Sequence, residues 1–379
     1  MDLELSDDQI DLRDNVRAVL ARECPASVVR GVYEGTDDAS ALWKQMVELG
    51  WPALCVPEQF GGLGMGFVEL GILAEELGRV SAPTPLLATV TQFAPLLVEV
   101  HRSAPSTEIG DLLADVVAGT RTGSLAFAEN GRWSPGSINA TASGEGDSLT
   151  VTGEKTAVLA GSEVDSFVVV ARLPGSEQSH HLGAFLVKRA DAEATTPPVI
   201  DPALGLADVR FDAAPATVLS AGDAGTEIAR AAEQAVVAMA LHTVGACRRI
   251  FEVTLEYAKV REQYDRVIGS FQALKHRFAD MYLAVEKANA ICYFAALAIA
   301  EDDARRSEAS HVAKVSSGDC QRLLAEEGLQ LHGGIGYTWE NDLHFLLKRA
   351  KVGDVLCGSA SWHRTRLAEL LGLSAVVAS

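Results

Sequence analysis

A single arginine in the last third of the chain stands where a phosphate could be held. Arg261 follows a long helical pattern and precedes the turn residues 265–269. A guanidinium in that place can clamp a pyrophosphate through two parallel hydrogen bonds, which a lysine cannot do as well. The simpler alternative is a surface ion pair with Glu262 or Glu256, because such pairs are common on protein surfaces. The residue type alone leaves both interpretations open.

Two glycines and two glutamines could extend such a site. Gly333 and Gly334 break a second long helical pattern. The backbone there can approach an anionic ligand closely, or the glycines can simply end the helix. Gln272 and Gln330 lie near helix termini, and their amides can donate and accept hydrogen bonds toward ribose, adenine or phosphate. Taken singly, each glutamine is a solvated helix residue.

Three zones of composition must position these residues. Residues 1–119 have helical periodicity, interrupted by a glycine-rich loop at 57–66. Residues 120–219 contain short β-rich runs separated by turn residues, typical of a small antiparallel barrel or sandwich. Residues 220–379 return to long helices with short connections, which pack as an antiparallel bundle. The sequence therefore predicts an α+β multi-domain chain with a helical, a β and a second helical domain.

The individual elements follow from the same patterns. Early helices are expected at 68–77 and 86–98, and Pro95 weakens the second of them. The expected strands are 124–127, 148–151, 166–171, 183–187 and 208–211, with hairpin turns at 146–147 and 175–179. The expected helices of the bundle are 226–260, 271–301, 306–331, 341–352 and 361–371.

Composition excludes several classes of function. Acidic residues outnumber basic ones 51 to 32, and the net charge of −19 disfavours binding to nucleic acid or to anionic membranes. The six cysteines are far apart and have no metal-ligand spacing, which favours a reducing compartment without a metal site. The N-terminus is polar and acidic, unlike a signal peptide, and apolar stretches such as 231–241 are too short to cross a bilayer. We expect a cytoplasmic protein.

Two longer segments around the possible phosphate site resemble a known family. Residues 260–282 read VREQYDRVIGSFQALKHRFADMY, and residues 330–352 read QLHGGIGYTWENDLHFLLKRAKV. Together they resemble the two flavin-binding signatures of the acyl-CoA dehydrogenase family, and residues 49–78 resemble its first domain. The resemblance covers nearly the whole chain in the family's order. It implies an N-terminal helical domain, a middle β-domain, a C-terminal four-helix bundle, FAD and an acyl-CoA substrate.

The resemblance also implies site residues and partners. The residues that it assigns to FAD are Arg261, Gln272, Gln330, Leu331, His332, Gly333 and Gly334. In the family this subsite generally lies across a subunit boundary, so at least a dimer is implied. The partner is a second copy of this chain or a homologous subunit, and the electron acceptor is expected to be a flavoprotein.

The loop that opens the β-domain departs from the family pattern. Family members usually carry a stretch like T-E-P-G-x-G-S-D, which contacts the flavin and the substrate. Here residues 126–137 read AFAENGRWSPGS. Glu129 is kept, but Ala128 replaces the expected hydroxyl, Asn130 replaces proline, and Trp133 is inserted. The flavin contacts expected from this loop are therefore weakened.

The catalytic base is the second departure. Removing the α-proton of a thioester needs a carboxylate whose pKa is raised in a dry pocket. The usual family position corresponds to Cys357, and the alternative position on the first bundle helix corresponds to Ala235. Glu233 is two residues away, about 200° around the helix, and Asp354 comes three residues early. The sequence assigns no catalytic residue.

Three functional hypotheses remain from these observations. The first is an FAD-dependent α,β-desaturation of an acyl-CoA in which this chain completes the FAD site of a catalytic partner, as in heterotetrameric, steroid-CoA-type dehydrogenases of actinobacteria. The second is a self-sufficient homo-oligomeric dehydrogenase with a displaced base, Glu233 or Asp354. The third is another flavin reaction on the same fold, an oxidase or monooxygenase.

Overall fold

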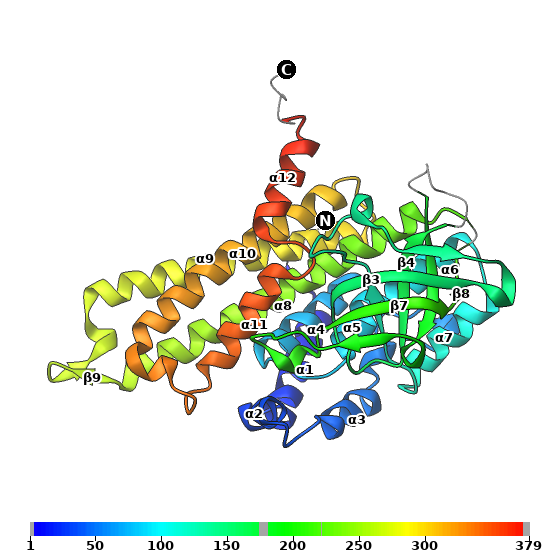
Figure 1. Ribbon diagram of the computed structural model, residues 1–379. Helices are drawn as coiled ribbons and strands as arrows, with labels where there is room; N and C mark the ends of the chain where they lie inside the picture. The colour runs from blue at the N-terminus through cyan, green and yellow to red at the C-terminus, as the bar shows by residue number, and fades with distance from the viewer. Residues whose placement is uncertain (1–3, 174–180, 221, 374–379) are drawn as a thin grey trace. The chain divides into compact units, whose positions relative to one another are not determined.

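The computed structural model describes residues 4–173, 181–220 and 222–373. Along the chain, helices come first, strands follow, and long helices return (Figure 1). This order confirms the predicted fold class. The predicted turn at 146–147 is confirmed, because a 3-10 turn at Gly146–Ser148 joins two paired strands. The predicted turn at 175–179 lies outside the described residues.

The N-terminal helices include the two predicted at 68–77 and 86–98, as well as Ala26–Glu34 and Thr107–Val117, which were not predicted. Ser6 begins the first of them with a capping box, in which its hydroxyl accepts from the backbone N–H of Gln9. The predicted helix over 86–98 is a continuous helical stretch with a π turn at Thr89–Phe93. Pro95 is the second residue of α6, directly after this π turn, where the hydrogen-bonding pattern of the helix changes. The helices are α1 (Asp7–Glu23), α2 (Ala26–Glu34), α3 (Ser40–Glu48), α4 (Phe67–Arg79), α5 (Leu86–Ala88), α6 (Ala94–Ser103) and α7 (Thr107–Val117).

The middle strands form one sheet in the order β6-β7-β3-β2-β4-β5-β8, and β1 pairs with β4. Most pairings are antiparallel, but β1–β4 and β2–β4 are parallel. All five predicted strands are present. The strands of two or three residues were missed, because so short a run has no visible alternation. The strands are β1 (Gly123–Ala126), β2 (Thr141–Ser143), β3 (Thr150–Val158), β4 (Ser166–Arg172), β5 (Leu182–Lys188), β6 (Glu193–Thr195), β7 (Ala207–Pro215) and β8 (Thr217–Val218).

The chain then returns to long helices that differ from the predicted bounds by three residues or fewer. They are α8 (Gly225–Val260), α9 (Gln272–Ala300), α10 (Arg306–His332), α11 (Leu343–Val355) and α12 (Ala360–Leu370). A two-stranded hairpin of β9 (Glu262–Gln263) and β10 (Arg266–Val267) separates α8 from α9, and a 3-10 turn at Gly333–Tyr337 follows α10.

The chain forms two compact units, which we call the bundle unit and the sheet unit. The bundle unit consists of Met1–Arg30, Gly71–Ala82 and Val236–Ser379, and the sheet unit of Gly31–Leu70 and Pro83–Ala235. These units cut the chain differently from the predicted limits at 119 and 219, which stay a prediction. In the sheet unit, α6, α7 and the start of α8 bury one apolar core against β1, β4 and β5.

Small residues allow α4 and α8 to cross closely inside the bundle unit. A Cβ added to Gly78 would lie against the carbonyl of His242, and one added to Gly245 against the carbonyl of Glu75. Either substitution would force the two backbones apart. His242 is buried at this crossing, and its Nδ1 donates to the carbonyl of Ala74 at 3.1 Å.

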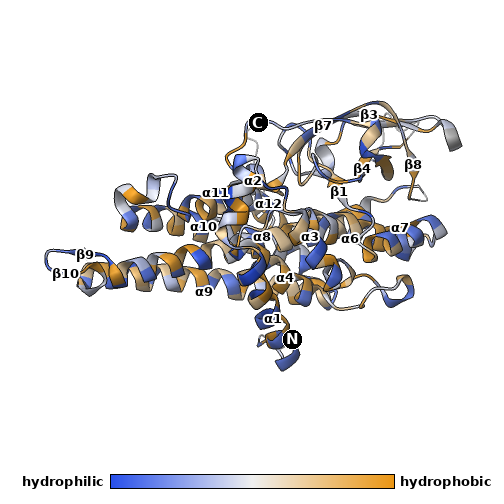
Figure 2. Cartoon of the chain, turned by 90° about the horizontal axis from the view of Figure 1, so that it is seen from below, coloured by the Kyte–Doolittle hydropathy of each residue, from blue (hydrophilic) through white to orange (hydrophobic). Residues whose placement is uncertain are grey.

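One described helix, α9, is long and apolar enough to cross a membrane by length and composition alone. The mean hydropathy of its most apolar window is 1.5, and 39% of that window is buried. The sequence analysis had missed this stretch. Hydrophilic residues interrupt α9 (Figure 2), and the helix packs against α10 along the bundle. A core helix of a bundle passes the same test, so the cytoplasmic location stays a prediction.

Candidate functional site

Three helix ends meet at one end of the bundle unit. The ring of Tyr257, near the end of α8, stacks on the ring of His332 at the end of α10, with centroids 4.5 Å apart. Arg277, near the start of α9, forms an ion pair with Glu327 of α10 at 3.3 Å. The β9–β10 hairpin lies at the same end (Figure 1). We call this region the flavin corner.

The flavin corner gathers the residues that the resemblance assigned to FAD. Arg261 follows Tyr257 by one helical turn, and Gln272 is the first residue of α9. Gln330 lies in the last turn of α10, just before the glycine pair. Both glutamines and Arg261 are exposed. Their side chains can therefore reach a ligand that lies on the surface.

The guanidinium of Arg261 forms no ion pair within the described residues. Glu256 instead accepts from Lys259 at 2.6 Å, and Glu262 belongs to the hairpin strand β9. The carbonyl of Arg261 accepts from the backbone N–H of Ile268 at 2.8 Å, which closes the hairpin and fixes the backbone of the arginine. The surface-pair interpretation of Arg261 is therefore wrong, and its donors remain available to a ligand.

The glycine turn exposes its backbone. Gly333 has φ 64° and ψ −143°, a conformation that only glycine adopts readily. A Cβ added to Gly333 or Gly334 would meet nothing within 4 Å, so the space beside both is open. Leu331 and His332 are buried, at 8% and 7% exposure. These two side chains support the turn from inside instead of facing a surface ligand.

His332 holds the end of α10 in place. Its Nδ1 donates to the carbonyl of Gly328 at 2.8 Å, and burial lowers the pKa of its ring. A second support comes from Arg30, which donates to the carbonyl of Trp339 at 2.8 Å and to Asp342 at 2.6 Å. Sequence reasoning missed Arg30, because about three hundred residues separate it from its partners in the chain.

The turn around Cys357 is closed. Cys357 has φ 58° and is 5% exposed, and burial raises the pKa of its thiol to about 12. The thiol therefore stays protonated and cannot accept a substrate proton near neutral pH. Ser359 caps α12 by accepting from the backbone N–H of Trp362 at 3.3 Å. A buried thiol in a capped turn performs a packing role.

Two histidines support this turn. The Nε2 of His363 donates to the carbonyl of Cys357 at 2.9 Å, and its Nδ1 lies 2.7 Å from the Nδ1 of His311. A neutral His363 that donates through Nε2 must accept through Nδ1, so His311 donates. Burial lowers the pKa of His363 to about 3 and that of His311 to about 4. Both rings are neutral at neutral pH.

Lys314 lies beneath the Cys357 turn and completes it. Its Nζ donates to the carbonyls of Gly353 and Asp354 at 2.7 Å each, satisfying the C-terminal end of α11. Burial lowers the pKa of Lys314 to about 8. Asp354 pairs with Lys351 at 3.2 Å, and its carboxylate faces Gly318 of α10. No sequence pattern indicates this role for Lys314, which looks like an ordinary helix residue.

In the sheet unit, the loop of residues 126–137 is fixed from inside. Glu129 accepts from the buried Lys155 at 2.8 Å and from the backbone N–H groups of Asn139 and Ala140 at 2.6 and 3.0 Å. Burial would raise the pKa of Glu129, but these donors outweigh burial and lower it. Trp133 packs on Phe127 with ring centroids 4.7 Å apart. The one residue kept from the family stretch is thus a structural carboxylate.

The alternative base position also lies in the sheet unit. Ala235 is buried in α8, and Glu233 is half-buried. The buried carboxylate in this region is Glu99 of α6, which accepts from Arg230 at 2.9 Å and from Gln234 at 3.0 Å. Sequence reasoning missed Glu99, although a charged residue within the apolar run of α6 indicates a buried partner.

Comparison with known proteins identifies the family. Residues 223–372 match the C-terminal domain of acyl-CoA dehydrogenases, and residues 6–100 match the N-terminal domain of the same family. The chain belongs to the acyl-CoA dehydrogenase family, whose members are FAD-dependent oxidoreductases acting on CH–CH bonds of acyl-CoA thioesters.

Individual relatives cover nearly the whole chain. It is 29% identical over 343 residues to the acyl-CoA dehydrogenase IpdE2 of Mycobacterium tuberculosis, covering 89% of both chains. The solved Tcur3481–Tcur3483 steroid acyl-CoA dehydrogenase variant is 27% identical, with a TM-score of 0.84 over 97% of this chain and 99% of that one. The ChsE4–ChsE5 complex of Mycobacterium tuberculosis is 24% identical, with a TM-score of 0.86 over 98% and 99%, and shows a likeness of fold.

The flavin corner fits the family's cofactor. FAD carries a pyrophosphate, and Arg261 provides exposed guanidinium donors at a fixed point of the backbone. The open backbone at Gly333 and Gly334 leaves room for close approach. The binding assignment of the individual residues stays a prediction, and the buried Leu331 and His332 can take part only through their backbone or as supports.

Proposed function

We propose that this chain is the FAD-completing subunit of a heteromeric acyl-CoA dehydrogenase whose homologous partner supplies the catalytic base. The observation that carries the proposal is the Cys357 turn, where a buried, protonated thiol takes the place of a carboxylate. The solved relatives described as a ChsE4–ChsE5 complex and as a Tcur3481–Tcur3483 steroid acyl-CoA dehydrogenase support a paired assembly and a bulky steroid-derived CoA thioester.

In this assembly the exposed residues of the flavin corner have binding roles. Arg261 holds the pyrophosphate of FAD, and the backbone at Gly333 and Gly334 lies against it. Gln272 and Gln330 hydrogen-bond to ribose, adenine or phosphate. Bound FAD supplies hydride acceptance from the β-carbon, while the partner's carboxylate takes the α-proton. Loss of this proton and hydride leaves an α,β-unsaturated thioester, and a flavoprotein acceptor would take up the electron pair.

The decisive experiment compares the isolated chain with the chain co-purified with its encoded homologous neighbour. We expect the isolated chain to dehydrogenate acyl-CoA about a hundred- to ten-thousand-fold more slowly than the pair, because base catalysis contributes that much. The pair should hold one flavin for two unlike chains. Flavin absorbance per chain and the rate of dye reduction measure both. Rapid turnover by a homo-oligomer with one flavin per chain would contradict the proposal.

A displaced base is the second candidate, and one observation favours it. Asp354 is 8% exposed, and one of its carboxylate oxygens has no hydrogen-bond partner within the described residues. A buried carboxylate of this kind can serve as a proton acceptor. The Asp354→Asn variant tests it: loss of activity from an active homo-oligomer would establish Asp354 as the base. In the heteromeric assembly the same variant should leave turnover unchanged.

A further inference from the structure

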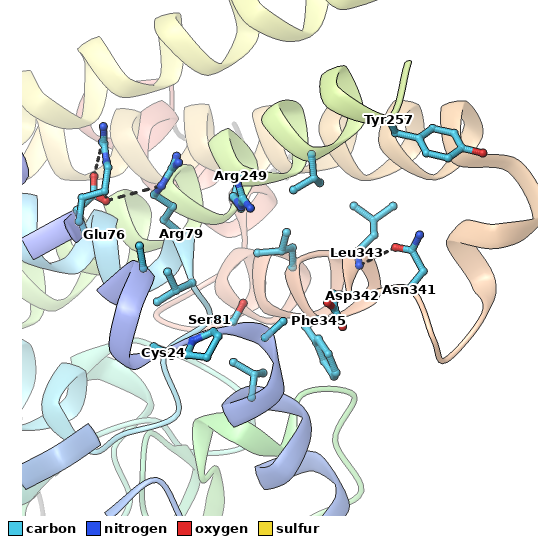
Figure 3. A pocket seen from close by; sticks show the side chains of 18 of the residues that line it. Cys24, Glu76, Arg79, Ser81, Arg249, Tyr257, Asn341, Asp342, Leu343 and Phe345 are labelled. Atoms are coloured by element: carbon cyan, nitrogen blue, oxygen red, sulfur yellow. Dashed lines mark hydrogen bonds and ion pairs between the residues drawn. The ribbon is translucent and has the colours of Figure 1, made fainter. Parts of the chain in front are cut away.

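A separate cavity of about 600 Å³ lies within the bundle unit (Figure 3). Its walls come from α1, the start of α2, the end of α4, the second half of α8 and the start of α11. The volume falls in the range of about 300–1,000 Å³ that small-molecule sites have. The cavity shares Tyr257 and His332 with the flavin corner, but the exposed residues assigned to FAD, Arg261, Gln272 and Gln330, do not line it.

One wall of the cavity is cationic. Arg79 and Arg249 both donate through Nη1 to Glu252, the second of them at 3.2 Å. Each guanidinium has five N–H donors, so one shared carboxylate leaves donors on both. Arg17 on the same wall pairs with Glu76 at 2.6 Å. Glu76 also lies 3.9 Å from Arg79, so the three arginines share two carboxylates and keep guanidinium donors for a ligand.

The opposite rim carries two acidic residues. Asp342 is neutralised there by Arg30 at 2.6 Å, and Glu340 is exposed to solvent. Because solvent screens an exposed carboxylate, Glu340 offsets little of the charge at the arginine wall. An anion in the cavity would therefore orient toward Arg79 and Arg249.

Ser81 places a buried hydroxyl at the floor of the cavity. Ser81 is 1% exposed and points into the cavity (Figure 3), and its Oγ has no hydrogen-bond partner within the described residues. Its φ of 54° and the bond from its backbone N–H to the carbonyl of Gly78 fix its position just after α4. A buried hydroxyl without a partner is destabilising and is rare in native proteins. This hydroxyl is therefore available to a ligand.

The remaining surface is apolar, formed by Val29, Val253, Phe345 and Leu346 among others. We propose that this cavity binds an amphipathic monocarboxylate. The carboxylate lies against Arg79 and Arg249, the hydrocarbon body covers the apolar wall, and the hydroxyl of Ser81 donates to a ligand oxygen. The proposal does not depend on the proposed function.

The first test uses three probes on the purified full chain by isothermal titration calorimetry. Decanoate carries both required features, 1-decanol lacks the charge, and acetate lacks the hydrocarbon body. We expect decanoate to bind at one site per chain, at least about tenfold more tightly than either control, since one lost charged or apolar contact costs about that factor. The absence of saturable decanoate binding, or equal affinity for 1-decanol, would overturn the proposal.

The second test uses matched variants. Arg249→Gln should weaken decanoate binding at least about tenfold. Arg364→Gln is its control, because the two side chains are 44% and 45% exposed and each pairs with one acidic residue. Ser81→Ala should weaken binding several-fold while leaving the melting temperature of the free chain unchanged or raised, because it removes an unsatisfied hydroxyl. Unchanged affinity in Arg249→Gln, or unchanged affinity with a lowered melting temperature in Ser81→Ala, would show that these groups are structural.

Discussion

Two turns of the bundle unit follow consecutive helices and are built in opposite ways. The turn after α10 presents Gly333 and Gly334 with open space beside them, at the same end of the bundle unit as Arg261. The turn after α11 buries Cys357. The carbonyls of Gly353, Asp354 and Cys357 accept hydrogen bonds there from Lys314 and His363. The backbone of the first turn is open to a ligand, and the carbonyls of the second turn are used in hydrogen bonds within the protein.

Under the proposed function, the two turns separate two tasks of the dehydrogenase fold, which are binding of FAD and abstraction of the substrate α-proton. Cofactor binding needs exposed donors at fixed backbone positions, which the flavin corner retains. Proton abstraction needs a carboxylate in a dry pocket, and at the position that the resemblance assigns to the base the closed turn has the buried thiol of Cys357 instead. The two turns follow different helices, although α10, which ends at the open turn, also provides Lys314 and His311 to the closed turn.

The largest expected effect is on the closed turn. Lys314→Met would leave the carbonyls of Gly353 and Asp354 buried without donors, so we expect the free energy of unfolding to fall by about 2–5 kcal/mol. Lys351→Met is the control, because this 54%-exposed lysine of α11 pairs with the same Asp354 and should cost less than about 1 kcal/mol. Urea unfolding measures both. Equal losses would mean that the closed turn does not depend on its buried lysine.

The open turn should respond in binding instead of stability. Arg261→Ala removes charge-assisted hydrogen bonds worth about 1.5–3 kcal/mol, so we expect FAD affinity to fall by about 10–150-fold. The circular dichroism spectrum should stay the same, because the side chain is exposed and unpaired within the described residues. Flavin fluorescence titration of the chain together with its partner measures the affinity. Unchanged FAD affinity in this variant would remove Arg261 from the cofactor site.

The sequence predicts the residues of the open turn better than those that support the closed turn. The helices, the five longer strands and the gathering of Arg261, Gln272 and Gln330 at one bundle end were predictable, because periodicity and motif order carry them. The burial of Leu331 and His332 was not predicted, since a motif names positions but does not say which side chains face inward. Helix phase decides that, and here it turns His332 inward onto the ring of Tyr257.

For the closed turn, the sequence predicted only that no carboxylate stands at position 357. The sequence showed that Cys357 has no carboxylate, but its supports come from Lys314 and His311 on α10 and from His363 on α12. Contacts between residues so far apart in the chain leave no periodic signal. The same holds for the Glu129–Lys155 pair, because Glu129 comes before β2 in the chain and Lys155 comes after it. Long-range polar networks are what the patterns miss.

The closed turn should also be sensitive to acid. The pKa of His363 is lowered from 6.5 to about 3, so below pH 6.5 the unfolded chain binds a proton that the folded chain does not. Its contribution is fully present above pH 6.5 and is lost as the pH falls, by about 2 kcal/mol between pH 7 and pH 5. His363→Gln should show a correspondingly smaller loss in urea unfolding at the two values. An identical pH dependence in the variant would place the acid-sensitive group elsewhere.

The smallest expected effect concerns Cys357 itself. Cys357→Ala keeps the strained φ of 58° and removes one buried sulfur, so we expect a loss of about 1 kcal/mol in the free energy of unfolding. Turnover of the chain with its partner should not change, because a thiol with a pKa of about 12 carries no proton to or from the substrate. Stability and dehydrogenation rate are measured on the same preparation, with the parent pair as the reference. A tenfold or larger fall in rate, at unchanged FAD content, would mean that the thiol takes part in the reaction. The closed turn would then have a role beyond packing.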